Sequence, residues 1–323
     1  WRIESHCYPQ LNDPKYCPAR RNPGKFYTYD EIREVIKYAK ERGVMIIPEL
    51  DIPGHSQYFW TIFGFQMDDP RGMKILDKIP AEDCPYIHIG SDEVRRKMKD
   101  AEGFVRHYEE LLAKHNRIPI VWDPGIKPSS TTVCQIWNEA IKNSIAENKD
   151  YKNPYLDSYM GYLNHSSPVN NIHRHFLHQM CTVEKASERA LGGILCLWND
   201  VCLASYEQLM PINGMPIVML PFAERAWVGG KGYGLDYDMI VPGPENQGHH
   251  DLIEFEKKMV YHRDHHFKNV DCHWVANAHI PWQVTIPQPQ GTKIEDMKWE
   301  KAWGGSINLN AFAKAHGVKP GKK

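Results

Sequence analysis

The sequence lacks the features that mark several large classes of protein. No apolar run approaches the roughly 20 residues that a membrane-spanning helix needs. The formal net charge is −1, so the chain has no general basic field for nucleic acid or for an anionic membrane. No Gly-rich phosphate loop follows an apolar run, which weakens nucleotide-binding alternatives. We therefore expect a globular protein with no nucleic-acid partner and no membrane span.

Metal-binding signatures are equally scarce. None of the eight cysteines forms a CxxC pair, and Cys134 and Cys196 lie in apolar runs, where a buried free thiol is expected. Two histidine-rich groups, in residues 173–178 and 262–266, lack the HExxH arrangement, so we expect solvated or loop histidines there. The sequence predicts neither a metal nor any other cofactor.

The chain does contain a recurring pattern, in which a short apolar run ends in polar or acidic residues. Six runs show it, at residues 44–51, 86–93, 118–123, 133–138, 154–159 and 193–200. Amphipathic, helix-like stretches lie between several of them or follow the last one, at residues 29–43, 94–116, 216–228 and 251–266. The first of these has Thr28 as a candidate N-cap, Glu31 three residues later and Gly43 as a candidate stop.

Strands that alternate with helices predict an α/β fold with a parallel sheet. Polar residues at the carboxyl end of every strand favour a (β/α)8 TIM-type barrel over an open doubly wound sheet. Because only six strands can be counted, we predict a barrel that is incomplete at the N-terminus and lacks its first two strands. Residues 1–269 would form this barrel with its last helices. Residues 270–323, which contain Trp282, Trp299 and Trp303 and are interrupted by prolines, would form a tail or the start of a β-rich module.

Asp92 and Glu93 form the most informative pair, because they are adjacent carboxylates at the end of an apolar run. Consecutive strand residues point to opposite faces, so the pair does not easily straddle one glycosidic bond. Opposed catalytic carboxyls lie roughly 5–5.5 Å apart in retaining glycosidases and roughly 6.5–9.5 Å apart in inverting ones. Two adjacent carboxylates suit different roles, in which one group protonates the leaving oxygen and the other orients part of the substrate. The residues alone leave open a second reading, in which residues 91–93 cap the following helix.

Six motifs, in order along the chain, resemble those of family 20 glycoside hydrolases, the β-N-acetylhexosaminidases. Residues 88–93 fit H-x-G-[GSA]-D-E, and residues 48–55 fit P-E-[ILF]-D-x-P-G-H. Residues 1–4, 155–157, 197–200 and 223–227 are similar to the family's W-R-[IL]-E, Y-L-D, L-W-x-E and A-E-R-x-W. The resemblance covers roughly residues 1–230.

This resemblance implies an exo-acting glycosidase that removes terminal β-linked N-acetylglucosamine or N-acetylgalactosamine. Catalysis would be retaining and substrate-assisted, through an oxazolinium intermediate. Glu93 would be the general acid and later the base, Asp92 would orient the 2-acetamido group, and Tyr155 would donate a hydrogen bond to the acetamido oxygen. The implied sugar-binding residues are Trp122, Trp137, Asp157, Trp198 and Asp200, and the implied supporting residues behind the site are Asp51, His55 and His88.

Asp200 departs from the family pattern, which has Glu at that position. Together with the missing first strand, that departure motivates one alternative, a non-catalytic glycan-binding protein on the same scaffold. The incomplete barrel motivates another, an inactive fragment of the enzyme. The presence of Asp92, Glu93 and Tyr155 favours the enzyme, because a pure binder need not keep an acid and its orienting partner. The family implies a periplasmic, extracellular or lysosome-like compartment rather than the cytoplasm. The sequence gives neither the oligomeric state nor the preferred sugar epimer.

Overall fold

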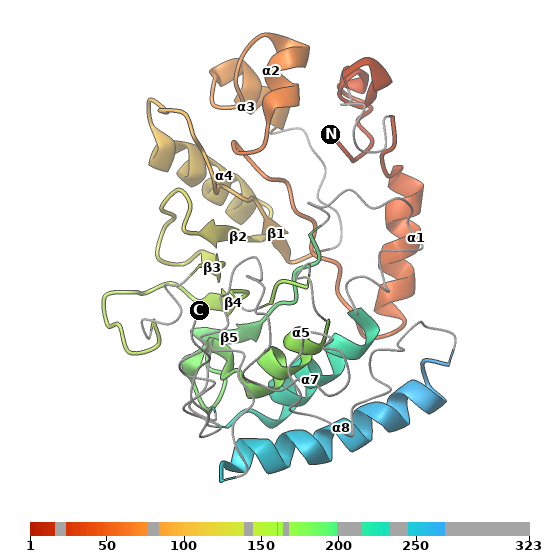
Figure 1. The fold of residues 1–323 in the computed structure, drawn as a ribbon. Helices are drawn as coiled ribbons and strands as arrows, with labels where there is room; N and C mark the ends of the chain where they lie inside the picture. Colours follow the sequence, from red (N-terminus) through yellow and green to blue (C-terminus); the bar gives the residue numbers. More distant parts are fainter. Residues whose placement is uncertain are drawn as a thin grey trace, which may run out of the picture. The chain divides into compact units, whose positions relative to one another are not determined.

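A computed structural model describes residues 1–16, 24–76, 84–138, 145–159, 161–163, 168–198, 215–230, 232 and 245–268 of the 323-residue chain. The chain divides into two compact units, whose elements are labelled in Figure 1. Unit 1 comprises Trp1–Asn138 and Tyr151–Tyr155, and unit 2 comprises Glu139–Asp150 and Leu156–Lys323. Within the described residues, no helix is long and apolar enough to cross a membrane.

Unit 1 has an α/β architecture. Its helical elements are η1 (Pro9–Asn12), η2 (Pro14–Tyr16), α1 (Tyr29–Lys40), α2 (Gln57–Phe63), α3 (Pro70–Leu76) and α4 (Ala101–Lys114). Its strands are β1 (Tyr86–His88), β2 (Ile118–Asp123) and β3 (Val133–Ile136), together with the first residue of β4 (Tyr155–Asp157). β1 pairs with β2 and β2 pairs with β3, both in parallel.

The three strands of unit 1 form because their side chains are buried between other layers of the unit. All four residues of β3 are buried, as is typical of a parallel strand that is covered on both faces. Helix α4 packs against β2 and buries Phe104 and Tyr108 (Figure 1). Ile87 and Ile120 are buried in neighbouring strands. The parallel register brings the carboxyl ends of β1 and β2 to one edge of the sheet, and the predicted acidic residues follow there.

The predicted strands are confirmed in part. Strands form in the runs that begin at residues 86, 118, 133 and 154; β2 fills its whole run, 118–123, whereas the other three are shorter than theirs. The first run, residues 44–51, makes only one parallel bridge, between Glu49 and His88. The last prediction is wrong in its position, because β5 spans Ala190–Gly193 and Cys196 makes only a single bridge to Tyr162.

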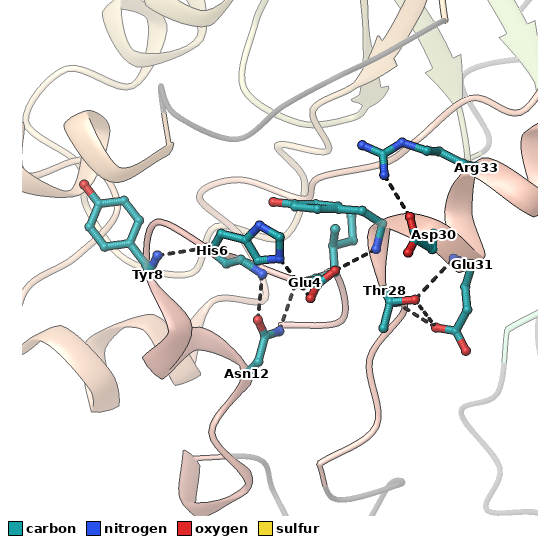
Figure 2. Close-up of polar contacts among 11 residues, drawn as sticks. Glu4, His6, Tyr8, Asn12, Thr28, Asp30, Glu31 and Arg33 are labelled. Carbon is teal, nitrogen blue, oxygen red and sulfur yellow. Dashed lines mark hydrogen bonds and ion pairs between the residues drawn. The ribbon is translucent and has the colours of Figure 1, made fainter.

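The N-terminal W-R-I-E segment is anchored to helix α1, as Figure 2 shows. The carboxylate of Glu4 accepts a hydrogen bond from the backbone N–H of Tyr29 at 2.8 Å and lies 3.0 Å from Nε2 of His6. The predicted capping box is confirmed, because Thr28 accepts from the N–H of Glu31 while Glu31 accepts from the N–H of Thr28. These bonds satisfy backbone donors that the first turn of a helix otherwise leaves unpaired.

Unit 2 contains the rest of β4 together with α5 (Pro168–Leu177), η4 (Met180–Thr182), β5 (Ala190–Gly193), α7 (Met215–Val228) and α8 (Gln247–His265). Helices α5, α7 and α8 pack against one another (Figure 1). They enclose an apolar cluster in which the rings of Phe176 and Phe255 stack with their centroids 4.9 Å apart. The prediction of solvated histidines at residues 173–178 is wrong, since His173, His175 and His178 are buried. His173 and His175 belong to α5, whose residues Ile172 and Phe176 pack in the cluster, whereas His178 follows the helix and contacts Asp157.

Candidate active site

The turn after β1 carries the two adjacent carboxylates in a backbone conformation that is unfavourable for most residues. Gly90, Ser91 and Glu93 have φ angles of 66°, 83° and 45°. Such left-handed residues cost about 1–3 kcal/mol each when they are not glycine, and they concentrate at functional sites. The turn is held in place by Asp51, whose Oδ1 accepts a hydrogen bond from the N–H of Ser91 at 3.2 Å.

Two glycines let the neighbouring segments approach this turn. A Cβ atom on Gly90 would lie 2.0 Å from Oδ1 of Asp51, and a Cβ on Gly54 would lie 2.5 Å from the carbonyl oxygen of Asp92. No side chain fits either position without movement of the segment opposite. The backbones of residues 53–55 and 90–93 therefore lie in close contact, which places His55 next to Asp92 and Glu93.

The reading of residues 91–93 as a helix cap is wrong. The helix predicted over residues 94–116 begins only at Ala101, and its N-cap is Asp100, whose side chain accepts from the N–H of Gly103 at 2.8 Å. Asp92 and Glu93 are thus separated from the helix by several residues of irregular chain. Their carboxylates are not used to satisfy its first turn.

His55 lies among three carboxylates. Its Nε2 atom is 3.5 Å from Oε2 of Glu93, 3.9 Å from Oδ1 of Asp92 and 3.9 Å from Oδ2 of Asp51. Two of the predicted supporting residues, Asp51 and His55, are therefore brought together with the proposed acid and its orienting neighbour. The Asp92 side chain is mostly buried, whereas those of Glu93 and His55 are about half exposed. A half-exposed carboxyl beside a buried one suits an acid that meets solvent or substrate.

Burial raises the pKa of several carboxyls in this cluster. It raises the pKa of Asp51 to about 6, with the negative charge of Asp92 adding to the effect and His55 opposing it. It also raises the pKa of Asp92, again against the influence of His55. Glu49 has its pKa raised to about 7, first by burial and then by the charge of Asp51. The cluster consequently holds protons close to neutral pH, as acid–base chemistry requires.

Glu49 is a member of this site that sequence reasoning missed. Its Oε1 atom accepts a hydrogen bond from the indole Nε1 of Trp122 at 2.8 Å and lies 3.5 Å from Nδ1 of His88. The signal that could have found it is the spacing of Glu49 and Asp51, because alternate residues of an extended segment share one face.

His88 supports the turn as a neutral ring. Burial lowers its pKa to about 4, so the imidazole is uncharged at neutral pH. Its Nδ1 atom accepts a hydrogen bond from the N–H of Gly90 at 3.0 Å, which places the ring proton on Nε2. His88, which was predicted to support the site from behind, therefore contacts Gly90, the residue that starts the turn.

The remaining predicted residues of unit 1 lie at the ends of the next strands. The indole of Trp122 is buried beside His88, and Nε1 of Trp137 donates to the carbonyl oxygen of Pro124 at 2.9 Å. Tyr155 is fully buried, and the ring of Tyr151 meets it edge-on at a centroid distance of 6.1 Å. The Tyr155 hydroxyl is thus not exposed to solvent in this structure.

Two predicted sugar-binding residues lie in unit 2, and a third lies outside the described residues. Asp157 is buried, and its carboxylate accepts hydrogen bonds from the N–H groups of Cys181 and Tyr159 and contacts Nε2 of His178 at 2.8 Å. These contacts occupy both carboxylate oxygens within the unit. Trp198 is partly exposed and stacks on Tyr162, with the ring centroids 6.4 Å apart. Asp200 belongs to the residues that the structure does not describe.

Among the residues that the structure describes, one group of side chains has a geometry that could hold a cation. Ligand atoms of Asp51, His55 and Asp92 all lie within 4.8 Å of one another. The same three residues surround the proposed acid, Glu93. The absence of a metal therefore stays a prediction from the sequence.

Comparison with known proteins gives a consistent family. Residues 1–71 match the model of the glycosyl hydrolase family 20 catalytic domain. The chain is 49% identical to a beta-hexosaminidase of Vibrio furnissii over 42% of this chain and 33% of that protein. It is 27% identical to beta-hexosaminidase subunit A1 of Dictyostelium discoideum over 70% of this chain and 50% of that protein.

A solved structure agrees with this family at the level of the fold. A glycoside hydrolase family 20 beta-N-acetylglucosaminidase has a TM-score of 0.53 to this chain at 15% identity, covering 80% of this chain and 63% of that one. The chain spans half or less of the length of these two curated relatives.

Proposed function

From the relation of this chain to the family 20 glycosyl hydrolases, we propose that the protein removes terminal β-linked N-acetylhexosamine from glycans. The observation that carries the proposal is the turn after β1, where adjacent Asp92 and Glu93 both reach His55 and neither caps a helix. Because both carboxylates approach the same Nε2 atom of His55, they do not flank one bond from two sides, so we place the nucleophile elsewhere. The 2-acetamido group of the substrate supplies it.

In this mechanism Glu93 protonates the leaving oxygen and later removes a proton from the attacking water. Asp92 accepts a hydrogen bond from the acetamido N–H and turns the carbonyl oxygen towards the anomeric carbon. The carbonyl oxygen displaces the protonated leaving group and closes a five-membered oxazolinium ring, which water then opens with retention of configuration. His55 lies 3.5 Å from Glu93 and 3.9 Å from Asp92, and it favours the charged form of Asp92.

The binding roles form part of the same proposal. Trp122, Trp137 and Trp198 are each proposed to offer an aromatic face to the acetamido methyl or to the sugar, since aromatic rings favour such apolar surfaces. Tyr155 would donate a hydrogen bond to the acetamido oxygen and so hold it towards the anomeric carbon. Asp157 is proposed to act through His178, which it contacts at 2.8 Å, because its own oxygens are already occupied. Asp200 would contact a sugar hydroxyl.

The finer description of the fold is also proposed rather than established. We infer a (β/α)8 barrel to which residues 1–269 contribute all but the first two strands, followed by a tail or β-rich module in residues 270–323. Support comes from apolar side chains of unit 1 that are more than half exposed, namely Tyr38 on α1 and Val44 and Met45 after it. Further strands beside residues 44–51 would cover such side chains.

The test of the proposed roles is the hydrolysis of aryl and alkyl N-acetyl-β-glucosaminides by three variants. Glu93→Gln should slow the cleavage of poor alkyl leaving groups by about 100-fold or more, because they depend on the acid, and slow activated aryl groups much less. Asp92→Asn should slow both. Glu110→Gln, which changes an exposed residue of α4, is the matched control. Equal losses for both leaving groups in Glu93→Gln would exclude its role as the acid.

A non-catalytic glycan-binding protein is the second candidate, and one observation favours it. The side chain of Tyr155 is fully buried, so its hydroxyl is not open to a ligand in this conformation. Calorimetric titration with N-acetylglucosamine separates the candidates when it is paired with the hydrolysis assay. Binding without turnover would support the binder, and turnover would exclude it.

A further inference from the structure

Glu49 connects three segments of unit 1 that meet at the proposed site. Its carboxylate accepts the indole N–H of Trp122, a residue 73 positions further along the chain, at 2.8 Å. Its backbone forms a parallel bridge with His88, and its Oε1 lies 3.5 Å from Nδ1 of that ring. Resting on the function proposed above, we propose that Glu49 is a positioning residue that fixes the Trp122 indole and thereby sets the affinity for the substrate's acetamido group.

The contacts around Trp122 explain why one hydrogen bond can control its orientation. The backbone N–H of Trp122 donates to the carbonyl oxygen of Gly90 at 2.9 Å, which ties the start of the side chain to the turn that carries the proposed acid. The indole lies against His88 with centroids 4.9 Å apart and an interplanar angle of 54°. Glu49 holds the far, nitrogen-bearing edge of the ring. The indole is therefore fixed at both ends relative to the turn.

This arrangement predicts an effect on binding rather than on bond cleavage. A wall that contacts the acetamido group holds it in the ground state and in the transition state alike, and uniform binding of this kind changes KM more than kcat. Glu49 contacts Trp122 and His88, and its charge also interacts with those of Asp51, Asp92 and His55. An effect that passes through the position of the indole must therefore be separated from an effect of the charge.

Two substitutions separate the position of the indole from the charge of the carboxylate. Glu49→Gln keeps an oxygen that can accept the indole N–H but removes the negative charge. Glu49→Ala removes both and leaves a buried donor without its acceptor. We expect Glu49→Ala to weaken N-acetylglucosamine binding roughly 10-fold, as the loss of a hydrogen bond that leaves a buried donor unpaired does, with kcat changed less than about 3-fold. Glu49→Gln should restore most of the affinity.

The matched controls are Glu110→Ala and a double-mutant cycle with Trp122→Phe. Glu110 is an exposed glutamate on α4, and its loss should leave binding unchanged. Phenylalanine has no N–H to donate, so Glu49→Ala should cost little further affinity in the Trp122→Phe background. Additive effects of the two substitutions would overturn the inference, as would equal losses for Glu49→Ala and Glu49→Gln.

A ligand-free measurement tests the positioning itself. In protein labelled with ¹⁵N-tryptophan, the indole N–H signal of Trp122 is assigned by its loss in Trp122→Phe. We expect the exchange of this hydrogen with solvent to accelerate roughly 10-fold in Glu49→Ala and to stay near the wild-type rate in Glu49→Gln. Unchanged exchange in Glu49→Ala would overturn the inference whatever the sugar result. Absence of both sugar binding and hydrolysis in the wild type would instead refute the proposed function.

Discussion

Replacing Gly90 with alanine should destabilise the protein more than the same replacement at other left-handed glycines. The φ angle of 66° costs an alanine about 1–2 kcal/mol. The added Cβ would also lie 2.0 Å from Oδ1 and 2.6 Å from Cα of Asp51, so backbone as well as side chain must move. Overpacking of this kind costs about 1–3 kcal/mol. The two contributions together predict a loss of about 2–5 kcal/mol.

Gly43 and Gly64 provide matched controls for this prediction. Their φ angles are 70° and 73°, and a Cβ on either would have no atom within 4 Å. Gly43→Ala and Gly64→Ala should therefore lose only the conformational contribution of about 1–2 kcal/mol. Denaturant unfolding of the three variants, followed by circular dichroism, measures the difference. A loss in Gly90→Ala no larger than in the controls would refute the packing argument for the turn.

Three further predictions concern other parts of the chain. Burial raises the pKa of Glu256 from 4.5 to about 8, so the folded state binds more protons than the unfolded state between these values and stability falls as pH rises. Glu256→Gln should remove this fall and raise the free energy of unfolding by up to about 5 kcal/mol at pH 9 but little at pH 5. The control Glu254→Gln changes an exposed residue and should keep the fall. Parallel pH profiles of Glu256→Gln and wild type in thermal unfolding would contradict this prediction. Asp157→Asn should cost about 1–3 kcal/mol in denaturant unfolding, because it disturbs buried hydrogen bonds, and unchanged stability would mean that they contribute nothing. Thr28→Ala should cost about 1 kcal/mol through loss of the α1 capping box, and Thr28→Ser should restore most of it.

The elements that could be predicted are those whose stability is local or strongly patterned. The capping box of α1 involves Thr28 and Glu31, three residues apart, so the sequence shows both halves of it. The strands β1, β2 and β3 lie in apolar runs, and the sequence predicts them for that reason. β5 was misplaced because Ala190–Gly193 contains two glycines and little apolar surface, so pairing with distant chain decides its position.

The site residues that could be predicted from the sequence are those that belong to its recognisable motifs. The sequence identified Asp92 and Glu93, and His55 was expected nearby, where it indeed lies. The contact between Glu49 and Trp122 joins residues 73 positions apart, and no periodic pattern connects them. Asp157 was expected to face sugar, but its sequence context does not reveal that backbone N–H groups fold over its carboxylate. Such contacts depend on tertiary packing and become visible only in the structure.

The central claim is that the substrate's own acetamido group is the nucleophile beside Asp92 and Glu93. The most direct test compares kcat/KM of the wild-type protein for 4-nitrophenyl N-acetyl-β-glucosaminide and for 4-nitrophenyl β-glucoside. A positioned intramolecular nucleophile predicts a preference of at least about 1,000-fold for the N-acetylated substrate. Comparable hydrolysis of the two substrates, or hydrolysis of neither, would contradict the account.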